Sequence, residues 1–326
     1  MLAVVTGASG HLGASLVRAL LDQGWEVRAL VRSDTRALES MDIDLTPGDV
    51  LDKDSLRIAF AGADVVFHLA GRISIVGWDC CEVEAINTTG VGNVIDACLH
   101  TNVKRLVHAS SFHACCQHPL EDALDETRPL LDGGRHPPYN RTKARGEKIL
   151  MSAVRDGLDA VIVSPTGMLG PNDYKPSHFG ATLIALAKGR LPALVSAGLD
   201  WVDTRDVAQG MIAASQEAEC GSKYMLSGHW ARLTDIARYI AGITGIKPPR
   251  LVLPMPVAKA VSPLAELYCR ASGSRPLFTP ISMKELESNP QISHAKASRE
   301  LGYQPRPLEQ TLDDTLNWFQ AHGFLD

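Results

Sequence analysis

Short apolar runs alternate with helical periodicity through the first half of the chain. Consecutive apolar residues predict strands buried on both faces at 2–5, 26–31, 64–70, 104–110 and 159–165. Apolar residues recurring every three or four positions predict helices at 11–21, 82–99 and 141–156. Strands that alternate with helices of about a dozen residues form repeated βαβ units. The pattern therefore predicts an α/β fold built on a doubly wound parallel sheet.

The pattern changes after Pro165. Residues 165–180, "PTGMLGPNDYKPSHFG", are rich in proline and glycine and predict a loop. The elements beyond it are short and separated by prolines, with helices expected at 233–243, 257–270 and 307–322. We therefore expect a first domain over residues 1–165, to which 201–228 returns, and a smaller lobe over most of 166–326.

Composition and charge narrow the class of protein. The chain has 326 residues, of which 45% are hydrophobic and 21% charged, as in ordinary globular proteins. A formal net charge of -5 gives no electrostatic footprint for nucleic acid or an anionic membrane. The seven cysteines show no zinc-type spacing, which indicates a reduced, cytoplasmic protein without a metal site. No apolar run is long enough for a signal peptide core or a membrane span.

A glycine-rich turn carries the first candidate chemistry. "TGASGHLG" (6–13) follows the first strand and opens the first helix, with glycines at positions 7, 10 and 13. Glycine permits a tight turn and lets backbone approach a pyrophosphate, and a helix N-terminus presents free N–H groups to the anion. This context predicts a Rossmann-type domain that binds a dinucleotide through Gly7, Gly10, His11, Leu12 and Gly13.

The end of the second strand bears on which dinucleotide is bound. An NAD site usually has an acidic residue there to bind the ribose hydroxyls. Here the strand ends "ALVRSD", and Arg32 stands nineteen residues after Gly13. A guanidinium suits the 2′-phosphate of NADP, with Ser33 and Arg36 in support. NADP is therefore favoured, and the alternative is an exposed Arg32 with Asp34 serving NAD.

Two later strand ends supply further candidate contacts. "GDV" (48–50) closes the third strand, and Asp49, followed by Val50, is placed either to meet the adenine amine or to cap the next helix. "HLAG" (68–71) closes the fourth strand. The small side chains there would allow backbone contact between Leu69, Ala70 and Gly71 and the middle of the cofactor.

Tyr139 and Lys143 stand four residues apart, on one face of a helix, but this spacing alone is common. Other motifs accompany them in order: TGASGHLG, GDV, HLAG, INTTG (86–90), HASS (108–111), PTGMLGP (165–171), WVDTRDVA (201–208) and KASRELGYQPR (296–306). With these marks the chain resembles the extended short-chain dehydrogenase/reductase superfamily over nearly its whole length. The branch of dihydroflavonol reductases and 3β-hydroxysteroid dehydrogenases is the nearest.

The resemblance implies a catalytic trio of Ser111, Tyr139 and Lys143, with Ser110 as an alternative serine. Tyr139 would donate the proton when a carbonyl is reduced. A free phenol has a pKa of about 10, and we expect the Lys143 ammonium and the cationic oxidised nicotinamide to lower it. Lys143 would also hold the nicotinamide ribose, and Ser111 would orient the substrate oxygen.

Other positions are assigned with their alternatives. Pro165 and Met168 would meet the nicotinamide carboxamide through their backbone. Phe112 stands where relatives carry a small residue and reshapes the pocket.

Two helices leave alternatives open. Asn87, on the apolar stripe of its helix, either braces the site or has its hydrogen bonds satisfied locally. The apolar face of 257–270 is read as an interfacial helix, a lid over the pocket or core packing.

The favoured function is NADP-dependent reduction of a small-molecule ketone or aldehyde, dihydroflavonol- or steroid-like, by a homodimer, as is usual for relatives. NAD is the alternative cofactor. One alternative function is a nucleotide-sugar epimerase or dehydratase that recycles its cofactor, although Arg232, Arg250 and Arg275 are too scattered for a diphosphate site. Another is a non-catalytic NADP(H)-sensing regulator, although such relatives typically lack the tyrosine or lysine.

Overall fold

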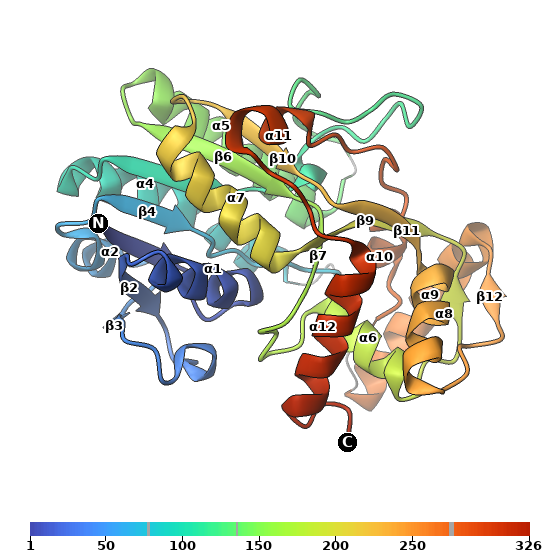
Figure 1. The fold of residues 1–326 in the computed structure, drawn as a ribbon. Coiled ribbons are helices and arrows are strands. Elements are labelled where there is room, and N and C mark those ends of the chain that lie inside the picture. The colour runs from blue at the N-terminus through green and yellow to red at the C-terminus, as the bar shows by residue number, and fades with distance from the viewer. Residues whose placement is uncertain (77–78, 135, 274–276) are drawn as a thin grey trace.

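A seven-stranded parallel sheet forms the frame of the computed structural model, which describes residues 1–76, 79–134, 136–273 and 277–326 (Figure 1). From edge to edge the strands are β3 (Asp44–Pro47), β2 (Glu26–Val31), β1 (Leu2–Thr6), β4 (Val65–His68), β5 (Arg105–Ala109), β6 (Ala160–Pro165) and β10 (Lys223–Leu226). Every neighbouring pair is parallel. The predicted doubly wound α/β fold is confirmed, and the last strand comes from the 201–228 segment.

Helices cover both faces of this sheet. One face carries α1 (His11–Asp22) and α7 (Thr204–Glu217), and the other carries α2 (Lys53–Phe60), α4 (Gly90–Thr101) and α5 (Pro138–Arg155). In β1, Ala3 and Val5 belong to the first core and Val4 to the second, and all three are fully buried. Burial on both faces is why these strands read as unbroken apolar runs.

Shorter helical segments complete this part. A short helix α3 (Cys80–Glu84) and a π-helical turn (Ala85–Thr89) lead directly into α4. Single 3₁₀ turns lie at Arg36–Leu38 and Phe112–Ala114, after β2 and β5. The chain thus runs β1, β2, β3 in one direction along the sheet and then continues from β4 in the other. Ligands of such folds bind at this reversal, outside the carboxyl ends of the strands.

The remaining elements gather at one end of the sheet, at the right and bottom of Figure 1. A three-stranded sheet joins β7 (Gly167–Leu169), β9 (Gly198–Asp203) and β11 (His229–Arg232), and β8 (Leu194–Val195) pairs with β12 (Val252–Leu253). The helices are α6 (His178–Ala187), α8 (Leu233–Thr244), α9 (Met255–Ser272), α10 (Pro280–Glu285) and α12 (Leu308–Ala321). Helix α11 (Ala295–Leu301) packs instead against α7 and β10 of the large sheet.

The loop predicted over 165–180 is partly wrong, because β7 and the start of α6 fall inside it. A Cβ at Gly167 would lie 2.6 Å from the Leu199 side chain, so this glycine allows β7 to pack closely beside β9. Ser177 then caps α6 by accepting a hydrogen bond from the Gly180 amide over 3.0 Å. Gly167 of this segment thus serves close packing and Ser177 serves capping.

The apolar face of α9 contradicts two of the three interpretations of residues 257–270, namely core packing and a lid over the pocket. Val257, Val261, Leu264 and Tyr268 are 44%, 45%, 69% and 72% exposed, which rules out core packing. None of the four lines the pocket described below, so the lid interpretation is also wrong for this face. The helix instead buries small residues, which are Ala258 and Ser262. Within the described part of the chain, every helix is too short or too polar to cross a bilayer.

Candidate active site

The carboxyl ends of four central strands open into one cavity of about 410 Å³. Residues that follow β1, β4, β5 and β6 form one side of it, and the end of the molecule built from α6, β8, β9 and α10 forms the other. The predicted site residues that line this cavity are Gly7, Gly10, His11, Leu12, Gly13, Leu69, Gly71, Ser111, Tyr139, Lys143, Pro165 and Met168. Arg32, Asp49, Val50 and Ala70 lie outside the lining.

The glycine turn has the shape that a phosphate-binding turn requires. Gly7 has a φ of +72°, and a Cβ there would lie 2.7 Å from the Ala70 nitrogen. A Cβ at Gly13 would lie 2.2 Å from the Gly7 carbonyl oxygen. The N-cap residue of α1 is Gly10, which has no side chain. No capping side chain therefore occupies the first backbone N–H groups of the helix. Gly10, His11, Leu12 and Gly13 line the cavity, and the free N–H groups of a helix N-terminus fit an anion such as a pyrophosphate.

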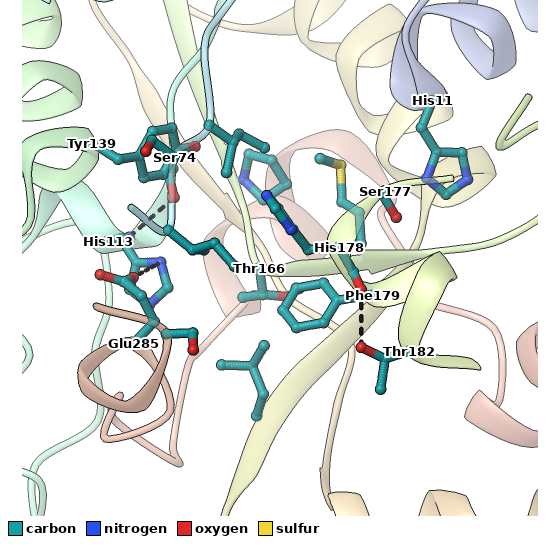
Figure 2. A pocket seen from close by; sticks show the side chains of 18 of the residues that line it. His11, Ser74, His113, Tyr139, Thr166, Ser177, His178, Phe179, Thr182 and Glu285 are labelled. Carbon is teal, nitrogen blue, oxygen red and sulfur yellow. Dashed lines mark hydrogen bonds and ion pairs between the residues drawn. The ribbon is translucent and has the colours of Figure 1, made fainter. Parts of the chain in front are cut away.

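The His11 ring connects this turn to the segment after β7. Its Nε2 lies 3.0 Å from the Gly170 carbonyl oxygen and 3.1 Å from that of Pro171. Figure 2 shows His11 at the opposite side of the cavity from Tyr139. The ring therefore holds two lining segments together, and its place in the turn keeps its backbone at the predicted phosphate position.

Arg32 and Asp49 lie side by side at the ends of β2 and β3. Their nearest atoms, Nη1 and Oδ2, are 3.7 Å apart, and the Arg32 side chain is 67% exposed. Asp34 is held by Arg36 through hydrogen bonds of 2.9 and 2.7 Å, which lower the Asp34 pKa to about 2. The interpretation of Asp49 as a helix cap is wrong, because Asp52 caps α2.

Val50 and Ala70 support the site from behind. Val50 is buried against α4, where a Cβ at Gly90 would lie 3.0 Å from its Cγ2 atom. Its carbonyl oxygen accepts a hydrogen bond from Asn93 Nδ2 over 2.9 Å. Ala70 donates its amide to Thr6 Oγ1 over 3.3 Å. These contacts place Val50 in the packing between strand end and helix.

Asn87 joins three segments and is not satisfied within its own helix. Its Oδ1 accepts from the Arg72 amide over 2.8 Å, and its Nδ2 donates to the Arg72 carbonyl over 3.0 Å and to Thr142 Oγ1 over 3.1 Å. It occupies the π-helical turn before α4. The bracing interpretation therefore fits the structure, since the side chain ties the segment after β4 to α5.

Helix α5 brings Tyr139 and Lys143 to one wall of the cavity. It begins at Pro138, and proline is well suited to a first helical turn because its missing N–H has no partner there. The Lys143 residue is 6% exposed, and its Nζ donates to the Ala109 carbonyl over 2.8 Å. Ser111 caps the following 3₁₀ turn by accepting from the His113 amide over 3.2 Å. The trio is thus assembled from the end of β5, which supplies Ser111, and from α5, which supplies Tyr139 and Lys143.

Burial shifts the pKa values of Tyr139 and Lys143 in opposite directions. It raises the pKa of Tyr139 to about 12, opposed by a hydrogen bond with Ser111 and aided by the Glu285 carboxylate. It lowers the pKa of Lys143 to about 8, opposed by the Glu147 carboxylate. The lowering expected from Lys143 is therefore not found, because the Lys143 ammonium is directed to Ala109. The part of the prediction that concerns the oxidised nicotinamide stays a prediction. At neutral pH the phenol keeps its proton and is able to donate it.

Ser110 is engaged elsewhere, in a buried network that the sequence interpretation missed. Its hydroxyl donates a short hydrogen bond to Glu147, whose other oxygen lies 2.7 Å from Lys223 Nζ. Lys223 also donates to Cys115 Sγ over 3.2 Å. Glu147 stands four residues after Lys143, so the helical face that holds Tyr139 and Lys143 could have pointed to it. No local pattern marks Lys223.

The rest of the cavity is largely apolar, and Phe112 contributes to it. Other apolar residues come from α6, from β8 and β9 and the residues before β8, from the start of α8, and from α10 and its flanks; they are Phe179, Leu191, Leu194, Val195, Leu199, Leu233, Leu277, Phe278, Met283 and Leu286. His113 and Glu285 interrupt this surface close to Tyr139, and sequence interpretation missed both (Figure 2). A ligand with a large apolar body fits these walls.

Known proteins are similar to the chain over its whole length. The model of the "NAD dependent epimerase/dehydratase family" matches residues 3–226. Sterol demethylase protein B of Methylococcus capsulatus is 34% identical, with 100% of both chains covered. A 3β-hydroxysteroid dehydrogenase/Δ5→4-isomerase of Mycobacterium tuberculosis is 27% identical over 97% of this chain and 90% of its own.

The crystal structure of gox2253 superimposes with a TM-score of 0.88 at 32% identity and covers 100% of this chain and 99% of its own. The resemblance predicted from the motifs is confirmed by the family match and by the hydroxysteroid dehydrogenase. The chain therefore belongs to the NAD dependent epimerase/dehydratase family, the extended short-chain dehydrogenases/reductases, and is an NAD(P)-dependent oxidoreductase.

Proposed function

We propose that this protein reduces the ketone or aldehyde group of an apolar small molecule with NADP(H), through Ser111, Tyr139 and Lys143. One observation carries the proposal. The three side chains share the wall of a cavity that continues into a long apolar surface. An apolar carbonyl compound, steroid- or flavonoid-like, satisfies that surface while presenting its oxygen to Tyr139.

Each member of the trio has a separate role. When bound, the cofactor supplies or accepts the hydride. The Tyr139 hydroxyl donates a proton to the carbonyl oxygen, which its raised pKa allows across the neutral range. Ser111 hydrogen-bonds the same oxygen and orients it. Lys143, whose ammonium donates to the Ala109 carbonyl in this structure, would hold the ribose hydroxyls of the bound cofactor and stabilise the phenolate that remains after proton transfer.

Binding of NADP(H) in preference to NAD(H) rests on Arg32. Asp34, the residue that would serve an NAD ribose, is already bound by Arg36 on both carboxylate oxygens. Arg32 is exposed beside Asp49 at the strand ends, where the 2′-phosphate belongs. The backbone of Leu69, Ala70 and Gly71 would contact the middle of the cofactor, and Pro165 and Met168 its carboxamide. Asp49 would meet the adenine amine.

A nucleotide-sugar epimerase, the alternative function, would need cationic side chains in its cavity to bind the diphosphate of the substrate. Among the described residues that line the cavity, the cationic side chains are Lys143, Lys175 and any protonated histidines, and there is no arginine. Arg232 and Arg250 lie outside that lining, and Arg275 lies outside the described residues. Polar side chains such as Thr166, Ser177 and Thr182 also line the cavity, but they are neutral and do not replace the cations that a diphosphate requires. The regulator alternative leaves the assembled trio without a role.

The test follows NADPH absorbance with a panel of apolar ketones and aldehydes and, in parallel, with UDP-sugars. We expect substrate-dependent NADPH loss with the carbonyls, reduced about 100- to 1,000-fold in Tyr139→Phe. Ser111→Ala should lower kcat strongly, whereas its neighbour Ser110→Ala, the matched control, should change it by less than about fivefold. Interconversion of UDP-sugars without net NADPH loss would overturn the proposal.

A further inference from the structure

Lys175 is a lysine of the cavity lining that the proposed chemistry does not use. It lies in the segment between β7 and α6, and the residue is exposed. Among the described residues its ammonium has no hydrogen-bond or ion-pair partner. The other lysine of the lining, Lys143, belongs to the trio and donates to the Ala109 carbonyl. Lys175 therefore brings an unpaired positive charge to the cavity.

The residues before Lys175 are fixed against helix α1. At the start of this helix, His11 Nε2 lies 3.0 Å from the Gly170 carbonyl oxygen. Two turns further along, Arg18 Nη2 donates to the Tyr174 hydroxyl over 3.1 Å. The segment thus runs beside α1, and the residue next to Lys175 is anchored to it.

The residues after Lys175 are fixed as well. Asp173 is buried, and its Oδ2 accepts from the Ser177 amide over 2.8 Å and from the Ser177 hydroxyl over 2.9 Å. Figure 2 shows Ser177 and His11 on the side of the cavity away from Tyr139. The backbone around Lys175 therefore has a defined place, and only the four-carbon stem that carries its ammonium is flexible.

The ammonium of Lys175 lies between the glycine turn and the loop that follows β2. Lys175 lines the same cavity as Gly10, whereas Arg32 lies outside that lining. Hydrogen bonds from Arg36 are the main cause of the lowered pKa of Asp34, and the charge of Lys175 adds to it. The ammonium is therefore within electrostatic range of the loop after β2, while its side chain faces the glycine turn.

A pyrophosphate is the ligand group that fits this position. The glycine turn and the N-terminus of α1 offer it only neutral backbone N–H groups. Both phosphates of a dinucleotide are negatively charged, so a cation on the facing segment adds the charge that the turn lacks. A lysine binds phosphate as a point charge on a flexible stem, which suits a residue that reaches across a cavity.

We propose that Lys175 is a cofactor-binding residue, which reaches from the segment before α6 to the pyrophosphate of the bound dinucleotide. The inference rests on dinucleotide binding at the glycine turn. It depends neither on the proposed carbonyl reduction nor on the choice between NADP and NAD. It also assigns to the cofactor one of the few cations of the lining, which leaves fewer for the diphosphate of a substrate.

The test measures the Kd of NADPH and of NADH by fluorescence titration, without a substrate and at low ionic strength. Lys175→Met removes the charge and keeps an apolar stem, whereas Lys175→Arg keeps the charge. Lys247→Met is the matched control, because Lys247 is also exposed but follows α8, outside the cavity lining. In a second titration, UDP-glucose is added to the NADPH-loaded wild type and Lys175→Met.

We expect Lys175→Met to raise the Kd of both cofactors about tenfold, because a charge-assisted hydrogen bond is lost. The factor should be similar for NADPH and NADH, since both carry the pyrophosphate, and it should shrink at high ionic strength. Lys175→Arg should bind both within about threefold of the wild type. Lys247→Met should change neither Kd by more than about twofold.

Unchanged affinity for both cofactors in Lys175→Met would overturn the inference. A loss confined to NADPH would also overturn it, because the ammonium would then serve the 2′-phosphate. An equal loss in Lys247→Met would show a general effect of net charge, and binding of UDP-glucose that depends on Lys175, with unchanged cofactor affinity, would assign the lysine to a substrate. Failure of the proposed function has a different signature. There, no ketone consumes NADPH, while both cofactors still bind in a manner that depends on Lys175.

Discussion

Glu147 Oε2 lies 2.7 Å from Lys223 Nζ, and this buried ion pair links α5, one turn beyond Lys143, to the edge strand β10. Glu147 is 1% exposed, and the Lys223 side chain is 14% exposed. The Glu147 carboxylate also accepts from Ser110 and favours the charged form of Lys143. A single carboxylate therefore balances two buried cations next to the site.

Replacing Glu147 by Gln should destabilise the protein strongly, by about 3 to 5 kcal/mol in urea unfolding, because two buried cations lose their counter-charge. The double variant Glu147→Met with Lys223→Met should be less destabilised than Glu147→Gln, since it leaves only the Lys143 ammonium without a counter-charge. A Glu147→Gln protein as stable as the wild type would show that the ion pair does not contribute to the free energy of unfolding.

Lys143→Met should abolish activity and stabilise the fold at pH 7. The pKa of Lys143 is about 8 when folded, against 10.5 for an ordinary lysine, so the unfolded chain binds more protons between these values. Wild-type stability therefore rises as pH increases through this window, and below it the buried ammonium costs about 1 to 3 kcal/mol. The advantage of Lys143→Met should be largest at pH 7 and shrink toward pH 10.

The control for this prediction is Lys148→Met on the same helix. Lys148 is exposed and pairs with Asp132 at the surface. Its replacement should change the free energy of unfolding by less than about 0.5 kcal/mol at any pH. A pH-independent difference for Lys143→Met would contradict the assignment of the cost to its buried charge.

Arg32→Ala should raise KM for NADPH about 10- to 100-fold and leave KM for NADH nearly unchanged, because the guanidinium would contact only the 2′-phosphate. Arg36→Ala is the comparison, since Arg36 is already held by Asp34. Initial rates with both cofactors at low ionic strength measure the effect. Equal changes for NADPH and NADH would argue against a phosphate contact.

The glycines of the site should differ sharply in their tolerance of alanine. In Gly13→Ala the new Cβ would lie 2.2 Å from the Gly7 carbonyl oxygen, so cofactor binding should fall by more than about 100-fold. In Gly71→Ala it would lie 3.3 Å from Asn87 Oδ1 and 3.4 Å from Lys143 Nζ, a mild crowding that should change kcat/KM by about twofold to fivefold.

Gly92→Ala is the matched control. Gly92 lies in α4 with nothing within 4 Å of the new Cβ, so alanine should stabilise the helix by up to about 1 kcal/mol without affecting the cofactor. Fluorescence titration with NADPH and thermal unfolding separate the three variants. Tight NADPH binding by Gly13→Ala would mean that the turn opens more easily than its packing indicates.

Local patterns in the sequence determined the frame of this protein. Unbroken apolar runs predicted strands buried on two faces, and helical periodicity predicted the helices between them, because both signals depend only on near neighbours. The turn around Gly7 and Gly13 and the i,i+4 placement of Tyr139 and Lys143 are local in the same way. None of these features depends on a contact between distant segments.

Only the tertiary structure decided what depends on residues far apart in the chain. Glu285 meets His113, Lys223 meets Glu147, and the burial of Tyr139 raises its pKa against the expectation from Lys143. Sequence periodicity indicates that a helix such as α9 has an apolar face, but it does not indicate whether another element covers that face. Pairing, burial and proton affinity arise from the packing of distant segments, and a sequence pattern carries no information about which segments meet.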